Sequence, residues 1–254
     1  MNILKADLFY LIKDNTFRVL LIITAVMPVI SCWVAYKFSG GNGISAETVV
    51  TQCIGADIMC ALLGIGMASF FGHDFANNTI RNKVCYGVSR EKIVLLSFVE
   101  CTIITASILL VNISVSFIAA AISGTTNVSD GFWLKYFCQI GILFAFAWLI
   151  TALTLCTKSS KPGIFATVIM TIFVAAAAQL IPKLAKISDV ARVVSRSLYM
   201  TVSTMMMKSV DGSYIATEGV VYDNMYLNAI LMTAFYCIIA VFLSLFVVKR
   251  QSYK

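Results

Sequence analysis

The sequence predicts an all-α membrane protein with six transmembrane helices. The chain has 254 residues, of which 60% are hydrophobic and 12% are charged. Soluble domains usually carry about 25% charged residues. Six runs also reach the length of roughly 20 mostly apolar residues that a helix needs to cross a bilayer. They lie at 17–37, 53–72, 94–122, 133–156, 163–181 and 227–248. We therefore expect one transmembrane domain over residues 1–254, in a multi-pass protein of the cell membrane.

Residues 1–16 predict a helix that lies in the membrane interface before the first span. Apolar residues recur there at helical spacing with charged residues between them, the pattern of an amphipathic interfacial helix. The apolar set is Ile3, Leu4, Leu8, Leu11 and Ile12, and the charged set is Lys5, Asp7, Lys13 and Asp14. A solvated N-terminal helix is the alternative.

The second apolar run carries a ridge of small residues. Every fourth position is small: Ala56, Cys60, Gly64, Ala68 and Gly72. Such a ridge lets another helix pack closely. The partner is either a helix of the same subunit or a helix of a second subunit.

Lysine and arginine cluster in alternate connecting segments. One set comprises Lys5, Lys13, Arg18, Arg81, Lys83, Arg90, Lys92, Lys158, Lys161, Lys249, Arg250 and Lys254, whereas the opposite short segments offer Lys37 and Lys135. The positive-inside rule therefore places both termini and the 73–92 loop in the cytoplasm. The net charge of +7 follows from this topology, so we do not infer nucleic-acid binding.

The segment 182–226 is predicted to be extracellular, although it also carries lysine and arginine. The positive-inside rule weakens as translocated segments lengthen. Apolar residues at helical spacing from Val190 to Met206 predict one or two interfacial or re-entrant helices there. A disordered loop is the alternative.

The 73–92 loop predicts a short helix with two unlike faces. Asp74 is a candidate N-cap for a helix that begins near Phe75. One face would rest on the membrane-embedded body, and the other would meet water or a partner. The first face has Ile80, Val84 and Val88, and the second has Asn77, Arg81, Asn82 and Lys83. From these residues alone, a helix that transmits a push and an ordinary basic loop are both open.

Two acidic residues fall within or near the spans. Asp57 lies near the outer start of the second run and Glu100 near the inner start of the third. Ionisable residues in spans are candidates for function, and an ion-coupled secondary carrier or channel would use them. An interfacial position is the simpler interpretation of both.

The sequence shows no enzyme motif and predicts no metal site. Its one histidine is His73, and its cysteines form no paired metal-binding pattern. The phosphate-binding motif GxxxxGK[ST] is absent. If the protein uses ATP, another chain hydrolyses it, and this chain carries no cofactor.

The order of elements and one local stretch resemble the membrane subunits of type-2 ABC transporters, the ABC-2 permease family. The stretch runs from Phe70 to Ser97 and contains Asp74, Asn78-Thr79 and Ser89-Arg90. It is especially similar to small permeases of Gram-positive bacteria that export peptides or give immunity to them. The chain departs from the pattern at Asn78, where glycine is usual, and at Leu95-Leu96-Ser97, where a lysine often occurs.

The resemblance implies a half-transporter whose 73–92 loop is a coupling helix seated in a separate ABC ATPase subunit. The implied coupling residues are Asp74, Asn78, Thr79, Arg81, Lys83, Ser89 and Arg90. ATP and Mg would bind the partner ATPase, and a second permease subunit, identical or not, would complete the path. The apolar spanning surface suits a hydrophobic or amphipathic cargo, such as a peptide, a lipid-like molecule or a drug. A membrane sensor or immunity protein that moves no cargo is an alternative.

Overall fold

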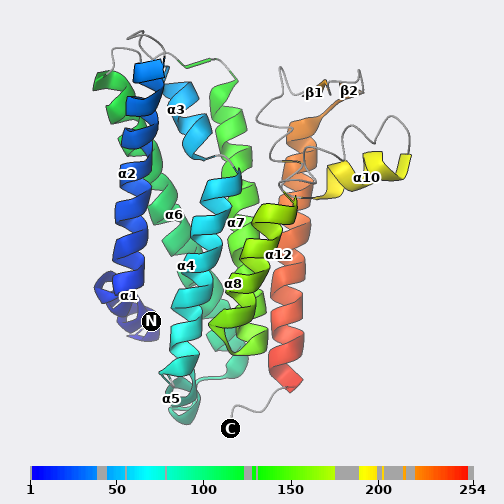
Figure 1. Ribbon diagram of the computed structural model, residues 1–254. Helices are drawn as coiled ribbons and strands as arrows, with labels where there is room; N and C mark the ends of the chain where they lie inside the picture. The colour runs from blue at the N-terminus through cyan, green and yellow to red at the C-terminus, as the bar shows by residue number, and fades with distance from the viewer. Residues whose placement is uncertain are drawn as a thin grey trace.

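The computed structural model describes residues 2–38, 45–54, 56–77, 79–122, 128–129, 131–174, 189–198, 202, 214–215 and 221–250. These residues form a bundle of long helices packed side by side (Figure 1). The spanning helices are α2 (Asn15–Phe38), α4 (Ala56–Ala76), α6 (Arg90–Ile122), α7 (Phe132–Thr157) and α12 (Met225–Arg250). Each has a segment long and apolar enough to cross a membrane. The chain is therefore an all-α membrane protein, as predicted.

The predicted fifth span begins as a helix that the structure describes in part. Helix α8 (Ser160–Ile169) continues into one π-helical segment, η1 (Met170–Val174). Residues 175–181 lie outside the described residues. Five spanning helices are thus present in the described part of the chain, and the count of six stays a prediction.

Short helices connect the long ones. Helix α1 (Asn2–Lys13) is the expected N-terminal helix. The Asp14 carboxylate caps the start of α2, because its Oδ1 accepts hydrogen bonds from the backbone N–H groups of Thr16 (2.6 Å) and Phe17 (3.1 Å). Helix α3 (Ala46–Cys53) precedes α4.

The predicted segment 182–226 is described only in pieces. Helix α10 (Asp189–Ser197) lies within it, followed by two two-residue strands, β1 (Tyr214–Ile215) and β2 (Val221–Tyr222), which pair antiparallel. The rest of the segment is mostly outside the description. Its interfacial or re-entrant character stays a prediction.

The small-residue ridge of α4 packs on α8 of the same chain. A Cβ atom at Gly72 would lie 2.7 Å from the Cα of Ser160, and one at Gly163 would lie 2.8 Å from the Cβ of Ala68. A Cβ atom at Gly64 would meet the Thr167 side chain at 2.5 Å. Packing within the subunit therefore uses the ridge, which was one of the two alternatives. Cys60 is buried in the same core, and the side chain of Ala56 lies outside the description.

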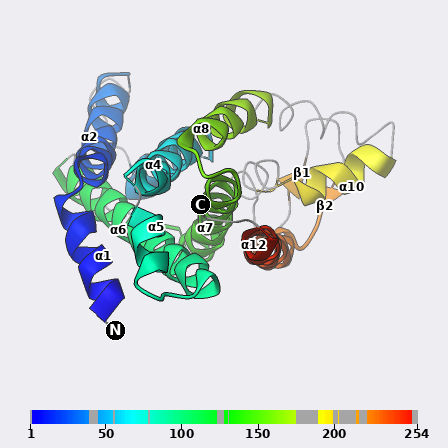
Figure 2. The ribbon, with the colours of Figure 1, turned by 90° about the horizontal axis from the view of Figure 1, so that it is seen from below.

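Helices α1 and α5 (Thr79–Cys85) and the C-terminal end of α12 lie at one end of the bundle (Figure 1, lower end). This arrangement agrees with the prediction that both termini and the 73–92 loop share one side of the membrane. Which side that is stays a prediction. The end view in Figure 2 shows α5 beside the ends of α4 and α6, with α1 next to them.

Candidate functional site

The candidate site is the short helix α5 together with the polar cavity behind it. Helix α5 has seven residues and connects α4 to α6. A short helix that begins near Phe75 was predicted in this loop, whereas the helix in the structure begins at Thr79. Its faces separate into an apolar side, an exposed polar side and a side turned to α1.

The apolar side of α5 packs on α6 and belongs to a hydrophobic cluster that also includes residues of α7 and α12. Ile80 is 2% exposed, and Val84 and Val88 pack half-buried beside it. Their cluster comprises Ile93, Val94 and Phe98 of α6, Ala152 and Leu155 of α7, and Ala240 and Val248 of α12. This packing was predicted from the spacing, and it is confirmed. A displacement of α5 would therefore reach α6 directly, and it would reach α7 and α12 through the shared cluster, because packed interiors transmit strain.

A Schellman motif ends α5 and fixes the turn into α6. The backbone N–H of Val88 donates to the Lys83 carbonyl at 3.1 Å, and the N–H of Gly87 donates to the Val84 carbonyl at 3.0 Å. Gly87 has a φ of 82°, in the left-handed region. Glycine adopts this conformation without the Cβ penalty of other residues.

The exposed side of α5 and its flanking turns is polar and partly aromatic. Asn77, Arg81, Asn82, Cys85 and Ser89 are exposed, and Tyr86 is 88% exposed. Among the proposed coupling residues, Arg81 and Ser89 therefore face outward. Arg90 is half-buried at the start of α6, and Asn78 lies outside the described residues.

Lys83 is turned toward α1, where the sequence had placed it on the outward face. Its Nζ donates to Asp7 Oδ2 at 2.9 Å, and both side chains are about one-sixth exposed or less, at 16% and 14%. The pKa of Lys83 is raised above its ordinary value. Burial alone lowers this pKa, but the hydrogen bond to Asp7 and the negative charges of Glu100, Asp7 and Asp74 outweigh burial.

Asp74 is not the N-cap that the sequence suggested. Helix α4 continues to Ala76, so Asp74 lies inside its last turn. The residue is 7% exposed. The apolar run before Asp74 favours continuation of helix α4. Packing of α4 against α5 and α6 outweighs the preference of Asp74 and its polar neighbours for an N-cap position.

Asp74 lines a cavity of about 240 Å³ between α1, α4, α5 and α6. The lining residues are Asp7, Tyr10, Phe70, Asp74, Thr79 and Glu100. Three of the proposed functional residues, Asp74, Thr79 and Glu100, thus meet at one place. Asp7 and Tyr10 were not among the functional residues predicted from the sequence, because no local pattern links α1 to residues so distant in sequence.

Glu100 is 3% exposed, although the sequence suggested that it would reach an interface. Its Oε1 is buried and has no hydrogen-bond partner among the described residues. The Glu100 carboxyl group is hydrogen-bonded to the side chain of Asp7, and its other charged neighbours are Lys83 and Asp74. Asp57, the other acidic candidate, has its backbone in α4 but its side chain outside the description. No three His, Cys, Asp or Glu side chains in the described part of the chain are placed to hold a metal ion.

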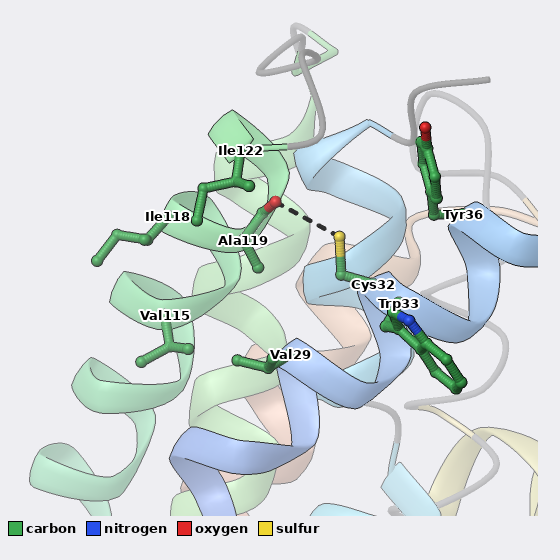
Figure 3. Close-up of a pocket in the computed structure, with 8 residues that line it drawn as sticks. All are labelled: Val29, Cys32, Trp33, Tyr36, Val115, Ile118, Ala119 and Ile122. Carbon is green, nitrogen blue, oxygen red and sulfur yellow. Dashed lines mark hydrogen bonds between the residues drawn. The ribbon is translucent and has the colours of Figure 1, made fainter. Parts of the chain in front are cut away.

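A second cavity, of about 380 Å³, lies between the far ends of α2 and α6 (Figure 3). Its walls are largely apolar and include Val29, Trp33, Val115, Ile118 and Ile122. Cys32 closes part of the groove by donating from Sγ to the Ala119 carbonyl at 3.4 Å. Trp33 remains 62% exposed and Ile118 60% exposed, so the groove opens to the bundle surface.

No protein-family model matches the chain, and no curated protein matches it either.

Proposed function

We propose that this chain is the transmembrane permease subunit of an ABC exporter, driven by ATP hydrolysis on a separate ATPase subunit. The observation that supports this most is the position of α5. Its Ile80 face belongs to a hydrophobic cluster with residues of α6, α7 and α12, and its opposite face exposes Arg81. An ordinary cytoplasmic loop requires only positive charge. A helix packed on α6 and joined to this cluster can pass a movement of a soluble partner to the membrane domain.

The mechanism is differential stabilisation of two states of the membrane domain. ATP binding favours a closed pair of ATPase subunits, and contact with α5 biases the packed helices toward one arrangement. The working unit would contain two permease subunits, identical or different, and two ATPase subunits. The resemblance of residues 70–97 to the ABC-2 pattern is the basis for this stoichiometry.

The cargo would be hydrophobic or amphipathic, such as a peptide, a lipid-like molecule or a drug. The groove between α2 and α6 supports this class, because residues such as Trp33 and Ile118 offer apolar surface that is open to the membrane. Ligand sites are commonly apolar with few polar groups. Loading the purified chain with a fluorescent amphipathic peptide, with and without Ile118→Asp, tests this assignment.

The decisive experiment is co-purification with an ABC ATPase encoded beside this chain. Arg81→Glu should weaken the complex at least about tenfold, since reversal of an interfacial charge opposes binding, and it should reduce ATPase stimulation. Lys37→Glu is the matched control, because Lys37 is exposed at the opposite end of the bundle and should change nothing. Unaltered binding by Arg81→Glu, in a protein that still folds, would contradict the coupling role.

Cys85 supplies an independent readout of the same contact. It lies on α5 and is exposed, whereas the other cysteines are buried or half-buried. ATPase binding should protect Cys85 from a membrane-impermeant maleimide. Equal labelling of the free chain and the complex would place the ATPase elsewhere.

A secondary carrier is the second candidate, and the buried oxygen of Glu100 is the observation that favours it. Such a carrier would move cargo in vesicles without any ATPase, driven by an ion gradient. Glu100→Gln would then abolish transport. Transport that requires ATP and survives Glu100→Gln would exclude the carrier.

A further inference from the structure

The cavity at the α5 end of the bundle gathers three acidic side chains beside one lysine. Asp7, Asp74 and Glu100 all line it. Lys83 pairs with Asp7 through a 2.9 Å contact, which leaves two carboxyl groups without an ion-pair partner among the described residues. Asp74 is 7% exposed and Glu100 is 3% exposed. Buried charges are costly unless they are paired and hydrogen-bonded.

A buried oxygen atom without a hydrogen-bond partner indicates which class of ligand the cavity binds. Glu100 Oε1 is fully buried without a hydrogen-bond partner in the described part of the chain, and Glu100 contributes to the cavity wall. A buried acceptor of this kind requires a donor. Because the residue is a carboxyl group, a donor with a positive charge satisfies both its hydrogen-bonding and its electrostatic need.

The shape of the site selects an organic cation over a metal ion. No three acidic, histidine or cysteine side chains in the described residues lie close enough together to coordinate a metal. The carboxyl groups instead surround a space of about 240 Å³, just below the ~300 Å³ at which drug-sized sites begin. An ammonium or guanidinium group carries several N–H donors, so it can satisfy more than one carboxyl group of the cavity wall.

Two aromatic rings complete the site. Phe70 is 5% exposed and lines the cavity wall, and Tyr10 is 43% exposed. Aromatic faces attract cations and also cover the apolar part of an organic ligand. The half-exposed Tyr10 leaves a way in from the side of α1.

We propose that the cavity lined by Asp7, Asp74, Glu100, Tyr10 and Phe70 binds a small organic monocation, a primary amine or a guanidine. The charged group lies between Asp74 and Glu100, and the apolar part lies against the two rings. Thr79 lines the same wall and adds a hydroxyl acceptor. The site is complete within one chain, so the proposal is independent of the ATPase and of the export function.

The test is titration of the full chain, in neutral detergent, with benzylammonium chloride and with benzyl alcohol at constant ionic strength. Benzylammonium should bind saturably at one site per chain, and the uncharged alcohol should not. Glu100→Gln keeps the side-chain shape and removes the charge, and it should weaken binding about 10- to 100-fold, as expected for loss of a charge-assisted hydrogen bond. Glu91→Gln is the matched control on the same helix, because Glu91 is 58% exposed and pairs with Lys249.

Two further variants keep the proposal testable if Glu100→Gln does not fold. Asp74→Asn removes the second carboxyl charge, and Tyr10→Leu changes only the mouth of the cavity; both should weaken benzylammonium binding. Absence of saturable binding to the wild type would overturn the proposal, because the charge must then be neutralised without a ligand. Equal binding of the alcohol would overturn it as well, as would unchanged affinity in every folded variant.

Discussion

Lys83 of α5 donates a hydrogen bond to Asp7 of α1 at 2.9 Å, across 76 positions of sequence. The contact fastens the N-terminal helix to the helix proposed to meet the ATPase. Both partners are largely buried, so neither is free to serve a partner without first breaking this bond. Movement of α5 is thereby linked to α1 as well as to the spanning helices.

Lys83→Met should destabilise the chain by roughly 3–5 kcal/mol at neutral pH, because it leaves Asp7 buried beside two other carboxyl groups without its partner. The measurement is thermal unfolding in detergent. Lys249→Met is the control, since the Lys249–Glu91 pair is 62% and 58% exposed and should contribute about 0–1 kcal/mol. Equal effects of the two substitutions would mean that burial of the Lys83 pair is unimportant.

The Lys83–Asp7 contact should also fail at high pH. The folded-state pKa of Lys83 is raised above the ordinary value of 10.5. Its contribution is therefore fully present below 10.5 and is lost as the pH rises through the higher folded-state value. The measurement is the free energy of unfolding of the wild type minus that of Lys83→Met, followed up to alkaline pH. This difference should be constant at neutral pH and should shrink only above about 10.5.

Gly72→Ala should destabilise the α4–α8 contact by about 1–3 kcal/mol, since the added methyl group would overlap the backbone of Ser160. Gly66→Ala is matched in helix and in substitution, but its methyl group would meet the side chain of Leu20 and not backbone. That variant should cost less than Gly72→Ala, because a side chain can shift more easily than backbone and alanine favours helix. A stable Gly72→Ala protein would show that α4 and α8 do not pack this closely.

Gly87→Ala should cost about 1–2 kcal/mol through backbone conformation alone. The φ of Gly87 is 82° and no atom lies within 4 Å of its added Cβ, so steric overlap contributes nothing. Gly87→Asn should cost less, because asparagine tolerates the left-handed region. Thermal unfolding of both variants checks the order, and equal losses would argue against a conformational cause.

Asn112→Leu should stabilise the chain by about 1 kcal/mol or more. Asn112 is fully buried in α6, and both polar atoms of its side chain lack partners among the described residues. Such a group carries an uncompensated desolvation cost. Gln139→Leu should have the opposite effect, because Gln139 Nε2 donates to the Ile54 carbonyl at 3.2 Å. If Asn112→Leu raises the unfolding temperature but reduces transport, Asn112 contacts cargo or a second subunit.

The inward orientation of Lys83 could have been predicted from the sequence, but it was not. Arg81 and Lys83 are two positions apart, which places them about 200° apart around a helix. Thr79 and Lys83 are four apart and share a face. This spacing could have separated the outward Arg81 from the inward Lys83, had the two not been grouped by charge.

The amino-acid sequence by itself determined the class of protein and the elements of the bundle. Apolar length defined the spanning helices, and helical periodicity identified α5 and its buried Ile80, because these signals are local and repeat along the chain. Gly87 fixed the end of α5 for an equally local reason, its tolerance of positive φ.

Only the tertiary structure decided which distant residues meet. The sequence gives no indication that Asp7, Asp74, Lys83 and Glu100 converge, because each lies on a different helix and nothing in their spacing records how those helices pack. Packing also decided that α8 covers the small-residue ridge of α4. The acidic cavity is therefore a property of the fold: close packing brings together charges that would each be solvated in an isolated helix.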